Sequence, residues 1–140
     1  MANSRHLIWD CIEGKIPYPP CDQLLGCEII EAEPGMITVA FNAKPEFLNP
    51  MGNIQGGFLA AMLDAAMGQV VATTLHPDEA SPTLELKINF LRPAAPGRLI
   101  GRGSVVHRGN SIAFVEGKLF DADNCLLATA TATAKIIKRA

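Results

Sequence analysis

The feature that most constrains the fold of this chain is an apolar run of nineteen residues, GFLAAMLDAAMGQVVATTL, at positions 57–75. Asp64 lies near its middle, where a charge costs roughly 2.5–3.5 kcal/mol on a membrane-insertion scale. The run is rich in alanine, and no basic flank follows it. We therefore predict a buried helix rather than a membrane span. Its large side chains spread around most of the helix, so that nearly every side must be covered: Phe58, Leu59, Met62, Leu63, Met67, Val70 and Val71.

Segments with strand character stand on both sides of this helix. Apolar and polar residues alternate over 83–91 with the two-residue period of a half-buried strand. Near the C-terminus alanine alternates with threonine, which indicates a strand with one face of small side chains that permits close packing. The predicted strands cover 26–32, 36–42, 83–91, 98–107, 111–121 and 126–138, the first two joined by the turn Glu33-Pro34-Gly35.

The order of elements predicts an α+β fold. A short helix and two strands precede the long helix and four strands follow it, which favours one central helix facing an antiparallel sheet of five or six strands. Since a sheet touches only one side of a helix, the remaining apolar surface is expected to be buried by another chain. We predict a homo-oligomer built on a twofold dimer, either a homodimer or a dimer of dimers, which is a homotetramer.

Length and charge exclude other classes of protein. A chain of 140 residues suits one domain, taken as 1–140, with 1–24 as an N-terminal helix and loop leading into the core. The net charge of −2 and the eight aromatic residues argue against a nucleic-acid partner. The charge is uneven, with ten acidic and three basic residues in 1–80 but four and nine in 81–140. Either the C-terminal half binds an anion or the two halves neutralise each other.

The four cysteines and three histidines are not spaced as metal ligands. No C-x-x-C pair occurs and the histidines are scattered, so we expect no metal site. The start, MANSRHLIWDCIEG, contains Trp, Asp and Glu where the apolar segment of a secretory signal would have to be uninterrupted. We expect a cytoplasmic protein with reduced thiols and no membrane partner.

A glycine-rich segment, Asn49-Pro50-Met51-Gly52-Asn53-Ile54-Gln55-Gly56-Gly57, leads into the long helix. Paired glycines at a helix start let unpartnered N–H groups approach a ligand at the positive end of the helix dipole. Such groups could form an oxyanion hole. The alternative is an ordinary turn between loop and helix.

Asp64 is the only charged residue of the predicted helix and lies in a stripe of small residues at positions 57, 61, 68 and 72. A lone carboxylate in an apolar helix is costly unless it is paired, hydrated or functional. Beside a cleft it could act as a general base on water or attack a carbonyl itself. The alternative is a structural Asp satisfied by neighbouring donors.

The loop Asn49-Pro50-x-Gly52-x-x-Gln55-Gly56-Gly57, Asp64 and the sequence TLELKINFLRPA at 83–94 ahead of Gly97 resemble the hotdog-fold acyl-CoA thioesterases of the phenylacetate-pathway (PaaI-like) type. The likeness extends over about residues 25–136. It implies a hotdog fold and hydrolysis of an aryl- or medium-chain acyl-CoA to the free acid and CoA. It implies no cofactor, because CoA is part of the substrate.

The resemblance also implies roles for single residues. Asp64 corresponds to the catalytic carboxylate, Gly56 to the glycine whose backbone N–H binds the oxyanion, and Asn49 to the asparagine that holds the attacking water or the thioester oxygen. Thr83 corresponds to the Ser/Thr that positions water. In the family the carboxylate and the glycine N–H come from different subunits, so the site would lie at a dimer interface. Further residues expected to contact substrate or CoA are Gly57, Glu85, Phe90, Arg108, Gly109, Asn110 and Ser111, with Arg92, Arg98 or Arg102 contributing if they face the groove.

Gln55 stands where the family usually has a histidine. A glutamine can donate a hydrogen bond to a thioester carbonyl but cannot carry a proton near neutral pH. This departure supports a second hypothesis, a non-catalytic hotdog domain that binds acyl-CoA as a sensor or carrier. A hydratase would need a His paired with an acid, and no His lies in the motif. The segment GNSIA at 109–113 nearly matches a serine-hydrolase elbow but lies between two predicted strands.

Overall fold

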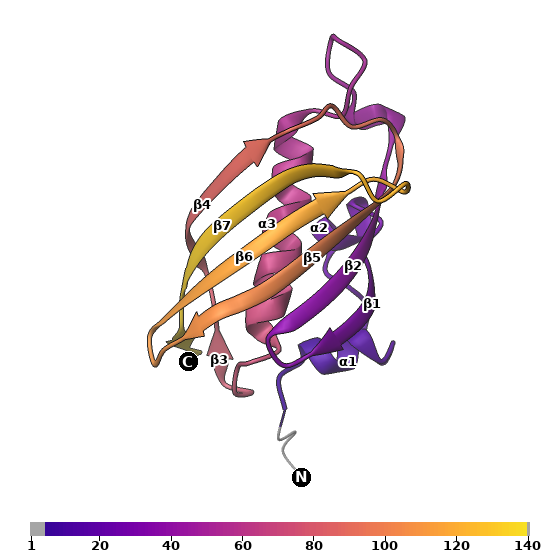
Figure 1. The fold of residues 1–140 in the computed structure, drawn as a ribbon. Helices are drawn as coiled ribbons and strands as arrows, with labels where there is room; N and C mark the ends of the chain where they lie inside the picture. Colours follow the sequence, from indigo (N-terminus) through magenta and orange to yellow (C-terminus); the bar gives the residue numbers. More distant parts are fainter. Residues whose placement is uncertain (1–4, 140) are drawn as a thin grey trace.

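One long helix lies across a strongly curved antiparallel sheet (Figure 1). The computed structural model describes residues 5–139. The sheet has six strands in the order β1-β2-β5-β6-β7-β4, so β1 forms one edge and β4 forms the other. This arrangement confirms the predicted α+β hotdog fold. The bounds are β1 Glu28–Glu33, β2 Met36–Ala43, α3 Gly56–Ala72, β4 Thr83–Phe90, β5 Gly97–Arg108, β6 Ile112–Phe120 and β7 Leu126–Lys135.

Shorter elements complete the chain. The expected N-terminal helix is present as two short helices, and the predicted domain limits, 1 and 140, lie outside the described residues. The strand predicted over 126–138 is wrong in its length, because it ends at Lys135. The chain then turns at the buried Ile136, and its last residues pair with a different strand. The short elements are α1 Ile8–Ile12, α2 Pro20–Leu24, the 3-10 helix η1 Pro45–Phe47, and the paired strands β3 Glu79–Ala80 and β8 Ile137–Lys138.

The core is the layer between α3 and the concave face of the sheet. Small residues on the central strands let the helix approach closely. A Cβ on Gly103 would lie 3.2 Å from the Ala66 carbonyl oxygen, and one on Gly117 would lie 3.0 Å from the Met67 side chain. On β7 the alanines face inward and are buried, as predicted from their alternation with threonine. A larger side chain at these glycines would push the helix off the sheet.

The large apolar side chains of α3 are covered within the chain itself. The sheet covers one flank, and the segment that contains α2 and Leu25 packs on another. What remains open is a stripe of small residues with Asp64, since Gly57 and Ala61 are exposed and Gly68 is half-buried. The N-terminal segment thus buries most of the helix surface that the sheet leaves uncovered, and the surface of α3 that remains for a partner chain is this stripe of small residues. Within the described part of the chain, no helix has the length and apolarity needed to cross a bilayer.

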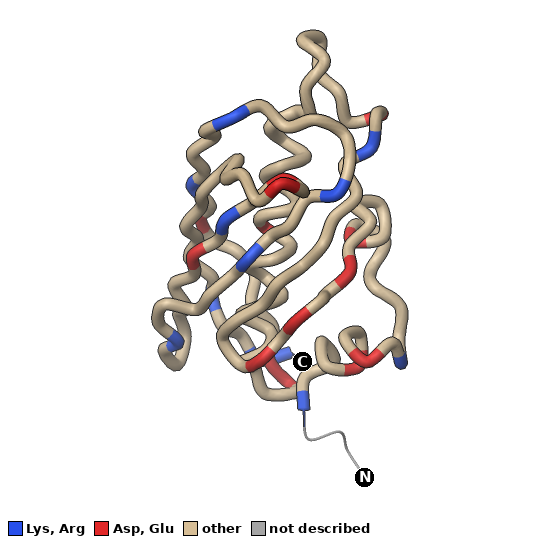
Figure 2. Tube along the Cα trace, turned by 45° about the vertical axis from the view of Figure 1, so that its right-hand side comes forward, with Lys and Arg blue, Asp and Glu red and all other residues tan. Residues whose placement is uncertain are grey.

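The edge strand β4 is less buried than its alternation predicts. Only Leu86 and Ile88 pack against the core, and both are half-buried. Leu84 and Phe90 are 59% and 53% exposed. The opposite edge is acidic, because β1 carries Glu28, Glu31 and Glu33 (Figure 2). Charged edge strands resist pairing with another sheet, whereas an apolar edge favours it.

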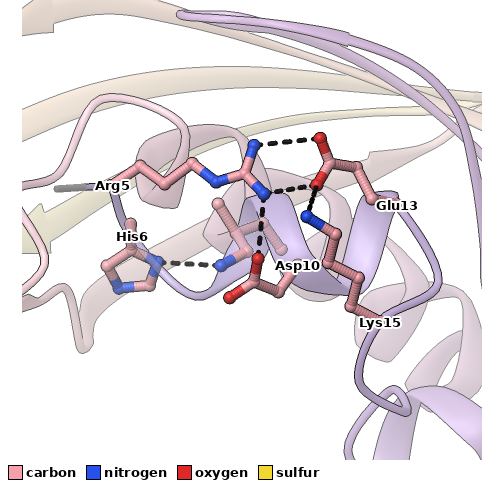
Figure 3. A network of polar contacts seen from close by, with 6 residues as sticks. Arg5, His6, Asp10, Glu13 and Lys15 are labelled. Atoms are coloured by element: carbon pink, nitrogen blue, oxygen red, sulfur yellow. Dashed lines mark hydrogen bonds and ion pairs between the residues drawn. The ribbon is translucent and has the colours of Figure 1, made fainter. Parts of the chain in front are cut away.

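Ion pairs stabilise the N-terminal segment internally, and His6 attaches it to the rest of the molecule. Arg5 pairs with Asp10 and Glu13 around α1, and Lys15 pairs with Glu13 at 3.1 Å (Figure 3). His6 is buried beside this network. Its Nδ1 accepts the N–H of Ile8 at 3.2 Å, so its Nε2 carries the proton toward the Glu79 carbonyl, also at 3.2 Å.

Burial lowers the pKa of His6 from its ordinary value of 6.5, and the nearby Arg139 lowers it further. The unfolded chain therefore binds a proton at His6 at a higher pH than the folded chain does, and acid favours unfolding. We expect the free energy of unfolding to fall as the pH drops below about 6.5. In His6→Asn, Oδ1 can still accept the Ile8 N–H but does not titrate, so the part of the decline that His6 contributes is lost. Urea titrations between pH 7.5 and 5 measure the free energy of unfolding of the wild type and of His6→Asn. If this free energy falls equally with pH in the two proteins, His6 does not have this role.

Candidate active site

Asp64 lies on the open stripe of α3, and the strand that follows holds its side chain. The hydroxyl of Thr83, the first residue of β4, donates a hydrogen bond of 2.9 Å to Asp64 Oδ1. Thr83 faces the helix because its neighbour across the ladder, Ala134, is buried in the core. The structure therefore brings together two predicted site residues that are 19 positions apart in the chain.

The Asp64–Thr83 pair lines a hollow of about 430 Å³ between α3, α2 and the segment that enters β4. Small side chains on the helix leave space beside the carboxylate. The other residues that line this Asp64 hollow are Cys21, Asp22, Leu25, Ala61, Ala65, Gly68, Gln69, Ser81 and Pro82.

A buried polar cluster, which sequence reasoning missed, borders the Asp64 hollow. Gln69 Nε2 donates a hydrogen bond of 3.2 Å to Asp22 Oδ2 and lies 3.3 Å from Cys27 Sγ. Burial raises the pKa of the Asp22 carboxyl above its ordinary value, and it raises the pKa of the Cys27 thiol to about 11. The cluster attaches α2 to α3 and so forms one wall of the hollow. In the sequence, the polar Gln69 inside an apolar run could have indicated such a cluster, but it did not indicate which residue would form a hydrogen bond with it.

Asn49 organises the loop that precedes α3. Its Oδ1 accepts the N–H groups of Met51 at 3.0 Å and Asn53 at 3.1 Å. Its own N–H donates to the Asn53 carbonyl at 2.7 Å, and Gly52 supplies the left-handed conformation of the turn with φ +82°. The side-chain NH₂ of Asn49 makes no hydrogen bond within residues 5–139, so it is the part of this side chain left for a ligand.

The two glycines at the start of α3 present free N–H groups. Gln55 precedes the helix in an extended conformation, and its carbonyl accepts the N–H groups of the two residues after Gly57. Neither the Gly56 nor the Gly57 N–H donates to any group among the residues that the structure describes. A Cβ on Gly56 would lie 3.2 Å from Phe90 Cζ, so the ring lies over this part of the backbone. Phe90 and the predicted oxyanion donors are therefore neighbours.

The predicted catalytic residues of one chain form two separate halves. Asn49, Gly56 and Phe90 line a hollow of about 420 Å³ at the start of α3, which neither Asp64 nor Thr83 reaches. Asp64 lies eight positions after Gly56 on the helix, or about 12 Å away at the rise of an α-helix. A single chain does not bring the carboxylate and the free N–H groups to one carbonyl group.

Other predicted contact residues lie elsewhere. Glu85 faces away from α3, since it stands opposite Thr133 on the outer side of the sheet. Arg108 Nη2 forms an ion pair of 2.7 Å with Glu79 Oε1, and its Nη1 donates to the Gly109 carbonyl. The turn with Gly109, Asn110 and Ser111 joins β5 to β6 at the end of the molecule that holds β3 and the C-terminus (Figure 1). This is the opposite end from the start of α3, so Arg108 is neither free nor near the glycines of its own chain.

These features define a hotdog-fold protein with a helix-borne carboxylate and a glycine-rich helix start. A model of the thioesterase superfamily matches residues 51–128, a segment that contains Gly56, Asp64 and Thr83. The chain belongs to the thioesterase superfamily and is a thioester hydrolase.

Individual relatives support this family at both the sequence and the structural level. A medium/long-chain acyl-CoA thioesterase, YigI, of Salmonella typhimurium is 29% identical over 131 residues, which are 83% of this chain and 84% of that protein. A phenylacetic acid degradation-related protein of Ralstonia eutropha is 38% identical with a TM-score of 0.87, over 91% of this chain and 98% of that one. A Streptococcus mutans protein bound to acetyl CoA is 26% identical with a TM-score of 0.74, over 81% and 91%. The second of these confirms the predicted PaaI-like type.

Proposed function

We propose that the protein hydrolyses the thioester of an aryl- or medium-chain acyl-CoA, with Asp64 acting on the carbonyl group. The observation that carries this proposal is the Asp64–Thr83 hydrogen bond of 2.9 Å beside an open hollow. A carboxylate that is held by one hydroxyl and borders free space has an oxygen left to accept a proton from water. Asp64 Oδ2 fits this description, because no hydrogen bond to it occurs within residues 5–139.

Hydrolysis then needs only a base and an oxyanion site. Asp64 removes a proton from water, whose oxygen attacks the thioester carbonyl carbon to form a tetrahedral intermediate. The C–S bond then breaks, and the proton passes from Asp64 to the leaving sulfur, which releases the acid and the CoA thiol and restores the carboxylate. Attack by Asp64 itself, followed by hydrolysis of the anhydride, is the alternative with the same products. The N–H of Gly56 stabilises the negative oxygen that forms on the carbonyl, and the Asn49 NH₂ and Gln55 side chains are the nearby donors.

A twofold dimer would unite the two halves of the site. In each chain β4 begins at Thr83, beside Asp64, and ends at Phe90, beside Gly56. If two β4 edges pair antiparallel about a twofold axis, Thr83 of one copy lies next to Phe90 of the other. The Asp64 of one chain would thereby face the Gly56 of its partner. The exposed Leu84 and Phe90 on this edge, against the acidic β1 edge, support the pairing.

The substrate class rests on relatives. YigI acts on medium- and long-chain acyl-CoA by its name, the Ralstonia eutropha protein is related to phenylacetic acid degradation, and the Streptococcus mutans protein binds acetyl CoA. A panel of phenylacetyl-, octanoyl- and acetyl-CoA, assayed by release of free thiol, tests the proposal. Turnover of the first two above the third supports it. Binding without any turnover would instead support the sensor or carrier function to which Gln55 points.

Asp64→Asn preserves the shape of the side chain and an oxygen that can accept the Thr83 hydroxyl, but it removes the base. We expect kcat to fall by about 100-fold or more, the effect of losing a general base. The free energy of unfolding, measured by urea titration, should change by less than about 1 kcal/mol, because the hydrogen bond survives. Wild-type turnover in this variant would exclude Asp64 from the mechanism.

Gly56→Pro tests the oxyanion donor. Proline is tolerated at the first position of a helix, and Gln55 already has the extended conformation that must precede it. The change removes one N–H group, and we expect kcat to fall by about 100- to 1,000-fold. Gly56→Ala is the matched control, because its Cβ meets the same Phe90 ring while the N–H remains. Equal losses in both variants would assign the defect to steric contact.

Mixed dimers test whether the site is shared. Asp64→Asn and Gly56→Pro chains, each with a different affinity tag, are expressed together and the doubly tagged dimer is purified. If the site is shared, one of its two sites carries both changes and the other carries neither, so about half of the wild-type kcat per dimer returns. Thiol release gives the readout, with each homodimer as a control. No recovery in a stable mixed dimer would place the whole site within one chain.

A further inference from the structure

The Asp64 hollow has a polar wall that the proposed hydrolysis leaves unused. Ala61 and Leu25 give the hollow apolar surface. On the side of α2, Asp22 and Gln69 line the same hollow, although they are only 8% and 7% exposed. Burying polar groups is costly unless each of their atoms finds a hydrogen-bond partner. The partners of these two side chains therefore show what the wall can still bind.

The amide oxygen of Gln69 has no partner. The nitrogen of the same amide is used twice, because Nε2 lies 3.2 Å from Asp22 Oδ2 and 3.3 Å from Cys27 Sγ. Oε1 accepts no hydrogen bond, and among residues 5–139 it is the only fully buried side-chain nitrogen or oxygen without one. An unpaired buried acceptor lowers stability, and a donor on a ligand recovers that free energy. Oε1 is thus available to a donor that the chain itself does not supply.

A ligand in the Asp64 hollow can reach this oxygen. Gln69 lines the hollow, and the last side-chain torsion of a glutamine is soft, so a small rotation turns Oε1 toward a ligand there. Asp22 adds carboxyl oxygens to the same wall, and their present donors are the Gln69 amide and the Cys21 thiol. A carboxylate oxygen can accept more than one hydrogen bond. The unused capacity of the wall is therefore that of an acceptor, and it fits a ligand group that donates.

The wall lies at a defined distance from the reacting carbonyl group. Gln69 follows Asp64 by five positions, or about 7.5 Å along the helix axis. In the proposed reaction the carbonyl carbon of the substrate lies at Asp64, and the small side chains of the helix leave room for the acyl group beside it. An acyl chain of about six carbons spans this distance at ordinary bond lengths. A group at the far end of such a chain meets Gln69 and Asp22.

We propose that Gln69 and Asp22 select acyl groups that carry a hydroxyl group at the end far from the thioester. The inference rests on the proposed function and names the class of acid that the Asp64 hollow accepts. The hydroxyl donates a hydrogen bond to Gln69 Oε1, which gains its missing partner, while Asp22 holds the amide through Nε2. An unsubstituted acyl chain leaves Oε1 unpaired and is the poorer substrate.

Three thioesters test this selection: hexanoyl-CoA, 6-hydroxyhexanoyl-CoA and 2-hydroxyhexanoyl-CoA. The last two are isomers that differ only in the position of the hydroxyl group. We expect kcat/KM for the 6-hydroxy compound to exceed that for hexanoyl-CoA by about tenfold, the effect of pairing a buried acceptor, and the 2-hydroxy isomer to show no such gain. Release of free thiol measures all three. If hexanoyl-CoA is hydrolysed as well as the 6-hydroxy compound, the inference is wrong and the proposed function stands.

A double variant assigns the selection to these residues. Asp22→Leu with Gln69→Met replaces both partners by apolar side chains, so that neither polar group is left unpaired. We expect it to prefer hexanoyl-CoA over the 6-hydroxy compound. Ser81→Ala is the matched control, because it removes a hydroxyl from the same hollow without changing the pair, and it should keep the wild-type ratio of kcat/KM. A wild-type ratio in the double variant would overturn the assignment. If this variant does not fold, the comparison of the two isomers in the wild type decides the inference.

Failure of the proposed function gives a different result. The wild type then hydrolyses none of the three thioesters, and calorimetric titration with each of them tests the selection without turnover. Tighter binding of the 6-hydroxy compound than of the other two supports the inference. Equal affinities, or no binding of any of them, would overturn it.

Discussion

The close approach of α3 to the sheet is the constraint on which the rest of the structure depends. Glycines at positions 103 and 117 and the alanine face of β7 let the helix backbone lie almost against the strands. Because the helix packs so closely on the sheet, the positions of its first residues and of its open stripe relative to β4 are fixed. The Thr83–Asp64 hydrogen bond and the contact of Phe90 with Gly56 both follow from that placement.

The same rigid helix keeps the two halves of the proposed site apart within one chain. A helix holds Gly56 and Asp64 about 12 Å apart whatever surrounds it, so no movement of a side chain can bring both to one carbonyl group. In the proposed dimer, a twofold axis along the edge strand would bring the halves of two chains together, because β4 has the carboxylate half at its beginning and the glycine half at its end. Pairing of the sheet edges and assembly of the proposed site are then a single event.

The N-terminal segment has a structural role that its sequence does not indicate. It covers the flank of α3 that the sheet leaves open, through the Asp22–Gln69 hydrogen bond and the packing of Leu25. His6 attaches the segment to β3 at one end of the molecule. The cover stops short of Asp64, so the carboxylate opens onto a hollow that α2 borders instead of being sealed in the core. Loss of this segment would expose apolar helix surface and remove one wall of the hollow.

The sequence alone predicted the long helix, the succession of strands along the chain and the candidate residues at the start and in the middle of the helix, because two-residue and helical periods, glycine pairs and a lone charge are local signals. The sequence could not determine which residues contact one another in the folded chain. Arg108 and Arg92 look alike in the sequence, yet Glu79 neutralises the first, and the second lines the hollow at the start of α3. Likewise, Gln69 reads only as a polar residue in an apolar run until folding brings Asp22 against it. Such pairings join residues far apart in the chain, so only the tertiary structure decides them.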